Sequence, residues 1–119
     1  MEADHDAQLL KGVLGLVLLR LLAEAESYGY ELVTKVHALG LTEVPDGSVY
    51  PALARLERDG HLVSRLVASQ SGPARKYYSL SPSGAVLLAR RERAWRSLVA
   101  CVAPLSEQQP LREAEVVAR

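Results

Sequence analysis

The fold is decided by residues 46–84, which read DGSVYPALARLERDGHLVSRLVASQSGPARKYYSLSPSG. Apolar residues at helical spacing predict a helix over about residues 48–59. From His61 onward apolar and polar residues alternate, which predicts a strand of about eight residues. A turn cluster at 70–73 then leads into a returning strand over residues 75–80. The stretch therefore predicts a helix followed by a β-hairpin.

Two further helices are predicted before this stretch. Leucine and valine fill almost every face of residues 9–23, so this helix is either buried or shared between the core and a second chain. The second helix covers residues 28–39, and Ser27 is expected to cap its N-terminus. The short spacing between this helix and the helix over 48–59 predicts a helix-turn-helix pair. Pro51 is expected in the first turn of the latter, where a missing backbone N–H costs no intrahelical hydrogen bond.

A long helix is predicted after the hairpin. Ser81 is an N-cap candidate with Pro82 at the first helical position, and the helix runs to about Val102, before Pro104 interrupts the chain. The order of three helices, a hairpin and a helix is that of a winged helix with an added C-terminal helix. The expected fold is therefore mainly α with a small β-hairpin. The expected parts are a winged helix-turn-helix domain over residues 1–80, of which 1–8 are flexible, a C-terminal helix over 81–103, and a tail over 104–119.

Length and composition restrict the class of protein. The chain has 119 residues and a mass of 12.9 kDa, which is enough for one domain. Apolar residues make up 49% and charged residues 24%, the balance of a globular protein. The longest apolar run, residues 13–19, is far shorter than the roughly 20 residues that cross a bilayer. The N-terminus is acidic where an export signal would be basic, so we expect a cytoplasmic protein with no membrane partner.

Catalytic and metal-binding patterns are missing from the sequence. The single cysteine, Cys101, excludes an intramolecular disulfide and is expected to be a small buried residue on the last helix. His5, His37 and His61 are scattered, without a carboxylate pair or metal-ligand spacing around them. His37 lies beside the apolar stripe of its helix and is expected to be structural. We therefore expect no enzyme, no metal and no cofactor.

The formal net charge is zero, but the charges are unevenly distributed. Residues 1–47 carry three basic and eight acidic side chains, whereas residues 48–103 carry nine basic and three acidic ones. Such an asymmetry is typical of a protein whose basic half meets an anionic partner. A solvated surface that alternates in sign explains the same counts, so charge alone leaves both interpretations open.

Five of the six aromatic residues are tyrosines, at the starts of two predicted helices and on the returning strand. In a winged helix these places lie on one side of the molecule, where helix N-termini and a basic hairpin form an anion-binding surface. The alternative is that the tyrosines fill the core and keep their hydroxyls at its rim. These residues are Tyr28, Tyr30, Tyr50, Tyr77 and Tyr78.

Several strings in this order resemble the PadR family of bacterial transcriptional regulators. They are LLKGVLGLVLLRLL (9–22), SYGYEL (27–32), DGSVYPALARLERDGHL (46–62), GPARKYYSLSPSG (72–84) and RAWRSLV (93–99). The resemblance extends over about residues 9–103. It implies a dimeric winged helix-turn-helix repressor of the compact branch, whose C-terminal helix forms the dimer with help from the first helix.

The resemblance also implies which residues contact double-stranded DNA. The helix over 48–59 would lie in the major groove, where small or apolar residues suit thymine methyl groups and Arg55 reaches a guanine edge or a phosphate. Val49 departs from the threonine or serine common at its position, so a role for it in reading sequence is not expected. The residues that match this helix motif are Ser48, Val49, Tyr50, Pro51, Ala52 and Arg55.

Two other parts of the chain match DNA-contacting motifs of the family. The start of the second helix, with Ser27, Tyr28 and Tyr30, is positioned for backbone phosphates, and Lys11 is a further phosphate candidate. The hairpin would be the wing, with a basic tip that enters or straddles the minor groove. The wing residues that match are Arg75, Lys76 and Tyr77.

The last helix carries an apolar stripe that a chain of this length has little core to cover. We expect the stripe to meet the first helix and a second copy of the chain, which would place two recognition helices on a pseudo-palindromic operator. The resemblance implies release of DNA by a small aromatic or apolar effector, and Trp95 is the candidate for binding it; the alternative is that Trp95 fills the dimer core. The alternative function is a winged-helix protein-interaction module without DNA binding. The stripe consists of Leu88, Trp95, Leu98, Val99 and Val102.

Overall fold

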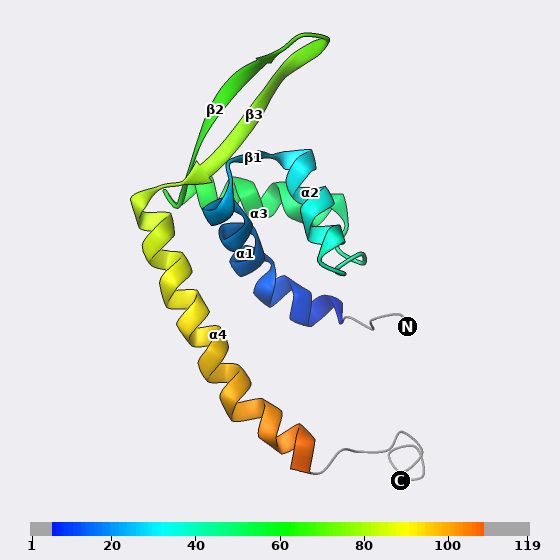
Figure 1. Ribbon diagram of the computed structural model, residues 1–119, viewed down its shortest axis with the longest axis vertical. Helices are drawn as coiled ribbons and strands as arrows, with labels where there is room; N and C mark the ends of the chain where they lie inside the picture. Colours follow the sequence, from blue (N-terminus) through cyan, green and yellow to red (C-terminus); the bar gives the residue numbers. More distant parts are fainter. Residues whose placement is uncertain (1–5, 109–119) are drawn as a thin grey trace. The chain divides into compact units, whose positions relative to one another are not determined.

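The computed structural model describes residues 6–108 and confirms a mainly α fold with a small antiparallel sheet (Figure 1). A first compact unit ends at Ala89 and a second begins at Arg90 within the last helix. The elements are α1 (Ala7–Glu24), β1 (Ser27–Tyr28), α2 (Gly29–Ala38), α3 (Asp46–Arg58), β2 (Leu62–Ser69), β3 (Gly72–Leu80) and α4 (Pro82–Gln108).

The core of the first unit is built by the apolar faces of the first three helices. Leu18 and Leu19 of α1, Leu32 and Val36 of α2, and Leu53 of α3 are fully buried. Each buried leucine stabilises the fold by about 1.5–3 kcal/mol relative to an exposed one. The helical periodicity of the sequence therefore identifies the core-facing sides of α2 and α3, whereas α1 is apolar on almost every face.

The sheet has three strands in the order β1-β3-β2, one more than the sequence predicts. Ser27 pairs with Tyr78, and its hydroxyl donates to the Ala25 carbonyl at 3.2 Å and accepts from Lys35 Nζ at 2.8 Å. The expected cap of α2 by Ser27 is wrong, because Tyr28 occupies the N-cap position and makes no side-chain capping bond. A two-residue strand is too short to show an alternating pattern.

Two prolines lie inside helices rather than at their ends. The α3 helix begins at Asp46, earlier than predicted, so Pro51 lies in its second turn and cannot donate to the Gly47 carbonyl. The expectation that Pro51 costs no intrahelical bond is therefore wrong. The α4 helix likewise continues past Pro104 to Gln108, whereas we expected it to end near Val102. The rest of the expected tail and residues 1–5 lie outside the described part.

The start of α4 is joined to the end of α3 by short polar contacts. The Ser81 hydroxyl accepts from the Gly84 N–H at 3.0 Å, which confirms its expected capping role, and donates to the Gly60 carbonyl at 2.6 Å. The Ser81 N–H donates to the His61 carbonyl at 3.2 Å. Gly84 packs so closely on His61 that a Cβ atom there would overlap the His61 carbonyl. This close backbone approach requires glycine at position 84.

Two expectations for the last helix are corrected by burial. Leu88 is 5% exposed and belongs to the core of the first unit, so it is not part of an available stripe. Cys101 is exposed rather than buried, because it lies in the part of α4 beyond this core.

His37 of α2 is structural as expected, because its Nε2 lies 2.7 Å from the Val44 carbonyl oxygen.

Replacing Gly84 with alanine should destabilise the protein by about 1–3 kcal/mol, because the new methyl group has to push the backbone at His61 away. Thermal unfolding followed by circular dichroism measures this loss. Gly12→Ala is the matched control, since a Cβ at Gly12 meets no atom within 4 Å and alanine raises helix propensity by about 1 kcal/mol. Equal melting temperatures for Gly84→Ala and wild type would contradict the close approach.

Candidate nucleic-acid interface

The helix-turn-helix pair sets which face of α3 is available. Val49 and Ala52 are buried in the core together with Leu53 and Leu56. Side chains on this inward face of α3 cannot reach a groove of DNA. The expectation that Val49 and Ala52 contact DNA is therefore corrected, and the departure from threonine or serine at Val49 has no consequence for sequence reading.

The opposite face of α3 carries the other residues expected at DNA. Tyr50 is 46% exposed, Pro51 and Arg55 are exposed, and Ser48 is half-buried. These positions follow one another at helical spacing on the side away from the core. The face combines a phenol, an apolar ring and a guanidinium group, which together can offer hydrogen bonds, apolar contact and positive charge to a base edge or a phosphate.

Tyrosines from three elements gather around one open recess next to α3. The Tyr50 ring packs directly on Gly29 at the start of α2, where a Cβ atom would lie 2.5 Å from Tyr50 Cε1. Glycine at this position thus lets α3 and the start of α2 come together. Four of the five tyrosines expected on one side therefore border this recess, and Tyr77 does not. The recess is lined by Tyr28, Gly29, Tyr30, Tyr50, Arg75, Lys76 and Tyr78.

The tyrosines of this recess differ in how far they are available. Tyr30 is 62% exposed at the start of α2, whereas Tyr78 is 8% exposed and packs in the core. Tyr77 does not line the recess but meets Tyr28 edge-on, with ring centroids 5.3 Å apart. Tyr30 is therefore available to an anionic partner, whereas Tyr78 fills the core.

Ser27 is fully buried, so the expected phosphate contact by its side chain is wrong.

Arg75 lies on the outer face of the sheet, where its guanidinium group stands 4.5 Å from the Tyr28 ring centroid. This distance is short enough for a cation–π interaction, which restricts the direction of the side chain. Arg75 is otherwise exposed at the edge of the recess. The wing thus presents one guanidinium group beside the start of α2.

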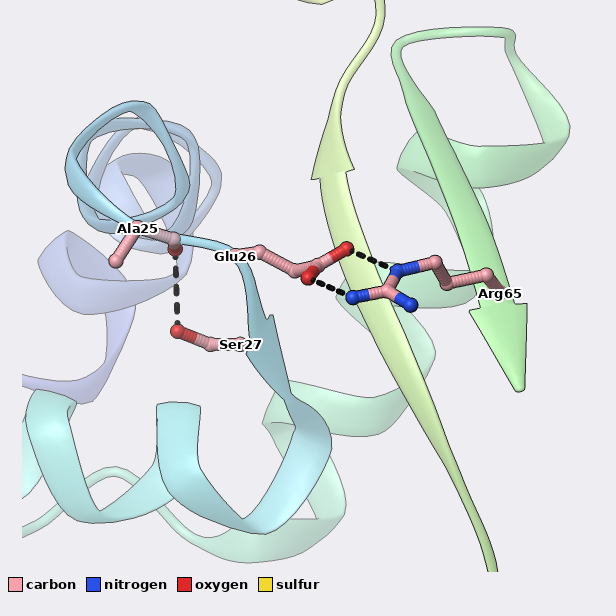
Figure 2. A network of polar contacts seen from close by, with 4 residues as sticks. All are labelled: Ala25, Glu26, Ser27 and Arg65. Carbon is pink, nitrogen blue, oxygen red and sulfur yellow. Dashed lines mark hydrogen bonds and ion pairs between the residues drawn. The ribbon is translucent and has the colours of Figure 1, made fainter. Parts of the chain in front are cut away.

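Arg65 forms an ion pair that the sequence analysis missed. Figure 2 shows its guanidinium group reaching across the sheet to Glu26, with Nε 2.8 Å from Oε2 and Nη2 2.6 Å from Oε1. These charge-assisted hydrogen bonds lower the pKa of Glu26 and raise that of Arg65. Two opposite charges separated by 39 positions give no signal in the sequence until the register of the sheet is known.

Lys76 is also paired within the protein. Its Nζ lies 2.8 Å from Glu57 Oε1, and Glu57 Oε2 accepts from the Ser64 hydroxyl at 2.5 Å. The bond from Lys76 is the main cause that lowers the pKa of Glu57, with a further contribution from Ser64. The pairing raises the pKa of Lys76 in turn. Glu57 and Ser64 were not predicted as part of the site.

The tip of the wing is not basic, contrary to expectation. The turn between β2 and β3 consists of Gln70 and Ser71, and β2 and β3 extend well beyond β1 and the three helices (Figure 1). Arg75 and Lys76 lie partway along β3 because they pair with Val67 and Leu66. The positive charge of the hairpin is therefore closer to α2 and α3 than to its tip.

Lys11 lies beside the start of α3. It lines a second, apolar recess together with Glu43, Val44 and Ser48. Lys11, predicted to contact a phosphate, and Ser48, predicted on the helix of the major groove, are thus neighbours although they are 37 positions apart in the chain.

In the second unit, the stripe predicted on α4 is exposed. Trp95 is 46%, Leu98 57%, Val99 41% and Val102 50% exposed. Leu105 continues the same face and is also exposed. A contiguous apolar surface of this kind is typical of a protein–protein contact.

Within residues 6–108 no group of three or more histidine, cysteine or acidic side chains could hold a metal ion. In the same part of the chain no helix combines the length and the hydropathy of a membrane span.

The three-helix unit with a helix-turn-helix pair and a β2–β3 hairpin as wing defines a winged helix-turn-helix protein, a class that binds DNA. Residues 18–90 match the family described as the transcriptional regulator PadR-like family. The chain belongs to this family and is a DNA-binding transcriptional regulator.

Solved structures of bacterial transcriptional regulators are similar to this one. A PadR-like transcriptional regulator from Bacillus cereus is 38% identical, with a TM-score of 0.76 over 83% of this chain and 96% of its own. A transcriptional regulator from Streptococcus is 34% identical, with a TM-score of 0.76 over 85% of this chain and 99% of its own. A PadR family regulator from Eggerthella lenta is 32% identical, with a TM-score of 0.76 over 86% and 88%.

The Glu57–Lys76 pair should make stability depend on pH. Because the folded-state pKa of Glu57 is lowered, its stabilising contribution is present above the ordinary value of 4.5 and is lost as pH falls through the folded-state pKa. Wild type should exceed Glu57→Gln in stability at pH 7 by up to about 1 kcal/mol, the range of partly exposed ion pairs. The difference should shrink between about pH 5 and pH 3, measured by urea unfolding.

Lys76→Met is the matched control for this pH dependence, because it removes the main cause of the lowered pKa and leaves the Glu57 carboxyl in place. In the Lys76→Met background, the effect of Glu57→Gln on stability should change less with pH over this range, because only the bond from Ser64 still lowers the pKa of Glu57. A constant difference between wild type and Glu57→Gln across the same range would contradict the pairing.

Proposed function

We propose that the chain is a homodimeric repressor that binds a pseudo-palindromic operator in double-stranded DNA. The observation that carries the proposal is the convergence of three elements on one recess. The exposed face of α3, the tyrosines at the start of α2 and Arg75 of the wing all border it. A surface that offers a helix, hydroxyl donors and a cation side by side suits a groove flanked by phosphates.

In this proposal the outward face of α3 enters the major groove. Tyr50 and Pro51 meet base edges and thymine methyl groups, and Arg55 hydrogen-bonds a guanine or a phosphate. Ser48 lies at the start of the same helix, and Lys11 of α1 lies beside it, where the lysine charge holds a phosphate. Val49 and Ala52 take no direct part because they are buried.

Phosphates next to the groove are held by the start of α2 and by the wing. Tyr28 and Tyr30 offer hydroxyl donors, and Tyr77 supports the Tyr28 ring. The cation–π contact holds Arg75 beside Tyr28, so its guanidinium group is already oriented at the edge of the recess in the free protein. Less side-chain entropy is then lost on binding.

Dimerisation in this proposal uses the exposed stripe of α4, namely Trp95, Leu98, Val99 and Val102, which would meet α1 and the stripe of a second copy. A small aromatic or apolar effector would bind at Trp95 and release the operator, and the indole offers it both a stacking face and an N–H donor. Packing within the dimer is the alternative role for Trp95.

Arg75→Ala should weaken DNA binding and flatten its salt dependence. Each protomer loses one phosphate contact, so the slope of log K against log salt should fall by about two per dimer. Wild-type affinity itself should fall about 10² to 10⁴-fold between 50 and 200 mM salt. Fluorescence anisotropy with a labelled duplex from upstream of the protein's own gene measures both quantities.

Arg58→Ala is the matched control for Arg75→Ala, since Arg58 is an exposed arginine at the end of α3 that bonds Asp59 and does not line the recess. It should keep the wild-type slope. An Arg75→Ala variant with wild-type affinity and slope would remove the wing from the interface. Wild-type protein that binds no duplex at low salt would instead favour a protein-interaction module.

The double variant Leu98→Glu with Val102→Glu should be monomeric, because two carboxylates on the exposed stripe would have to be buried against the partner. Sedimentation velocity at micromolar concentration measures the oligomeric state. Ser97→Glu with Ala100→Glu is the matched control, since it adds the same charge on the opposite side of α4 and should leave the dimer intact. A dimer that persists in the first variant would refute this interface.

A further inference from the structure

The two neighbouring cations of β3 face opposite sides of the sheet. Arg75 pairs with Val67 and lies on the outer face, whereas Lys76 pairs with Leu66 and lies on the face toward α3. Successive residues of a strand alternate in this way. The two residues therefore have different partners within the protein, Tyr28 for Arg75 and Glu57 for Lys76, although both line the same recess and belong to the motif that resembles a DNA-contacting wing.

Glu57 connects α3 to both strands of the wing through one carboxylate. Its Oε1 accepts from Lys76 Nζ of β3 at 2.8 Å, and its Oε2 accepts from Ser64 Oγ of β2 at 2.5 Å. Ser64 is paired in register with Tyr78, two positions after Lys76 on the same face of the sheet. Both oxygens are thus used, one for each strand of the hairpin.

Lys76 has a second contact that holds it toward the helices. Its Nζ lies 5.3 Å from the ring centroid of Tyr78, which is 8% exposed and packs in the core. A phosphate that took Lys76 away from Glu57 would leave the Glu57 carboxylate without its charged partner beside the recess that Lys76 lines. Such an exchange trades one anion for another and adds a repulsion, so it offers little gain in binding free energy.

We infer that Glu57 is a positioning residue of the DNA-binding surface, which holds Lys76 and Ser64 so that the wing stays fixed against α3. Lys76 is then a structural partner of Glu57, and Arg75 is the phosphate-binding cation of the hairpin over residues 62–80. The inference rests on the proposed function. Its physical basis is that a hairpin extending beyond the helices needs a contact near its base to keep a constant angle to α3, because α3 and the wing must reach adjacent grooves together.

The inference is tested by replacing the ion pair with an apolar pair of similar size. Lys76→Met alone should weaken binding about tenfold, because it leaves the Glu57 carboxylate unpaired beside DNA. Glu57→Met together with Lys76→Met should restore the affinity to within about threefold of wild type, since two methionine side chains keep contact between α3 and β3. The salt slope of this double variant should equal that of wild type.

Arg75→Met is the matched control, because it removes the neighbouring cation with the same replacement and should lower the salt slope by about two per dimer. The measurements use full-length protein and the labelled upstream duplex, after thermal unfolding has shown that each variant is folded. Rescue by the double variant with an unchanged slope supports the inference.

Two results would overturn it. A double variant that stays as weak as Lys76→Met, with a slope lowered like that of Arg75→Met, would mean that Lys76 itself contacts phosphate while the proposed DNA-binding function stands. Wild-type protein that binds no duplex at low salt would overturn the function and, with it, the inference.

Discussion

The burial of one face of α3 determines the rest of the interface. Val49, Ala52 and Leu53 lie in the core, where they pack with buried side chains of α1, α2, the sheet and the start of α4. With a period of 3.6 residues, this leaves the side with Tyr50 and Arg55 for a partner. The same periodicity that stabilises the fold thus selects the side chains that can reach DNA.

The charge of the surface is smaller than the sequence suggests, because carboxylates of the same chain pair with its cations. Glu26 holds Arg65 and Glu57 holds Lys76, so two of the three cations of the hairpin are occupied. The Glu26–Arg65 pair joins β2 to the residue before β1 (Figure 2), and the Glu57–Lys76 pair joins α3 to β3. Their main effect is to set the geometry of the surface, since partly exposed ion pairs contribute little to stability.

Glycine allows two close approaches that position the site. At Gly29 the Tyr50 ring packs on the backbone at the start of α2, and at Gly84 the first turn of α4 packs on His61. Both glycines stand within strings that resemble the PadR family. The resemblance marks these positions, and the packing explains why a side chain cannot occupy them.

The sequence by itself determined the helices, the hairpin, the Ser81 cap and the side on which the tyrosines gather, because periodicity and turn residues act over a few neighbouring positions. It did not reveal β1, whose two residues are defined only by pairing with β3. Nor did it separate Arg75 from Lys76, or exclude Val49, Ala52 and Ser27 from the interface. Only the tertiary structure decided these points, because the partner of a charge and the burial of a side chain depend on contacts between residues far apart in the chain, such as the 39 positions between Glu26 and Arg65.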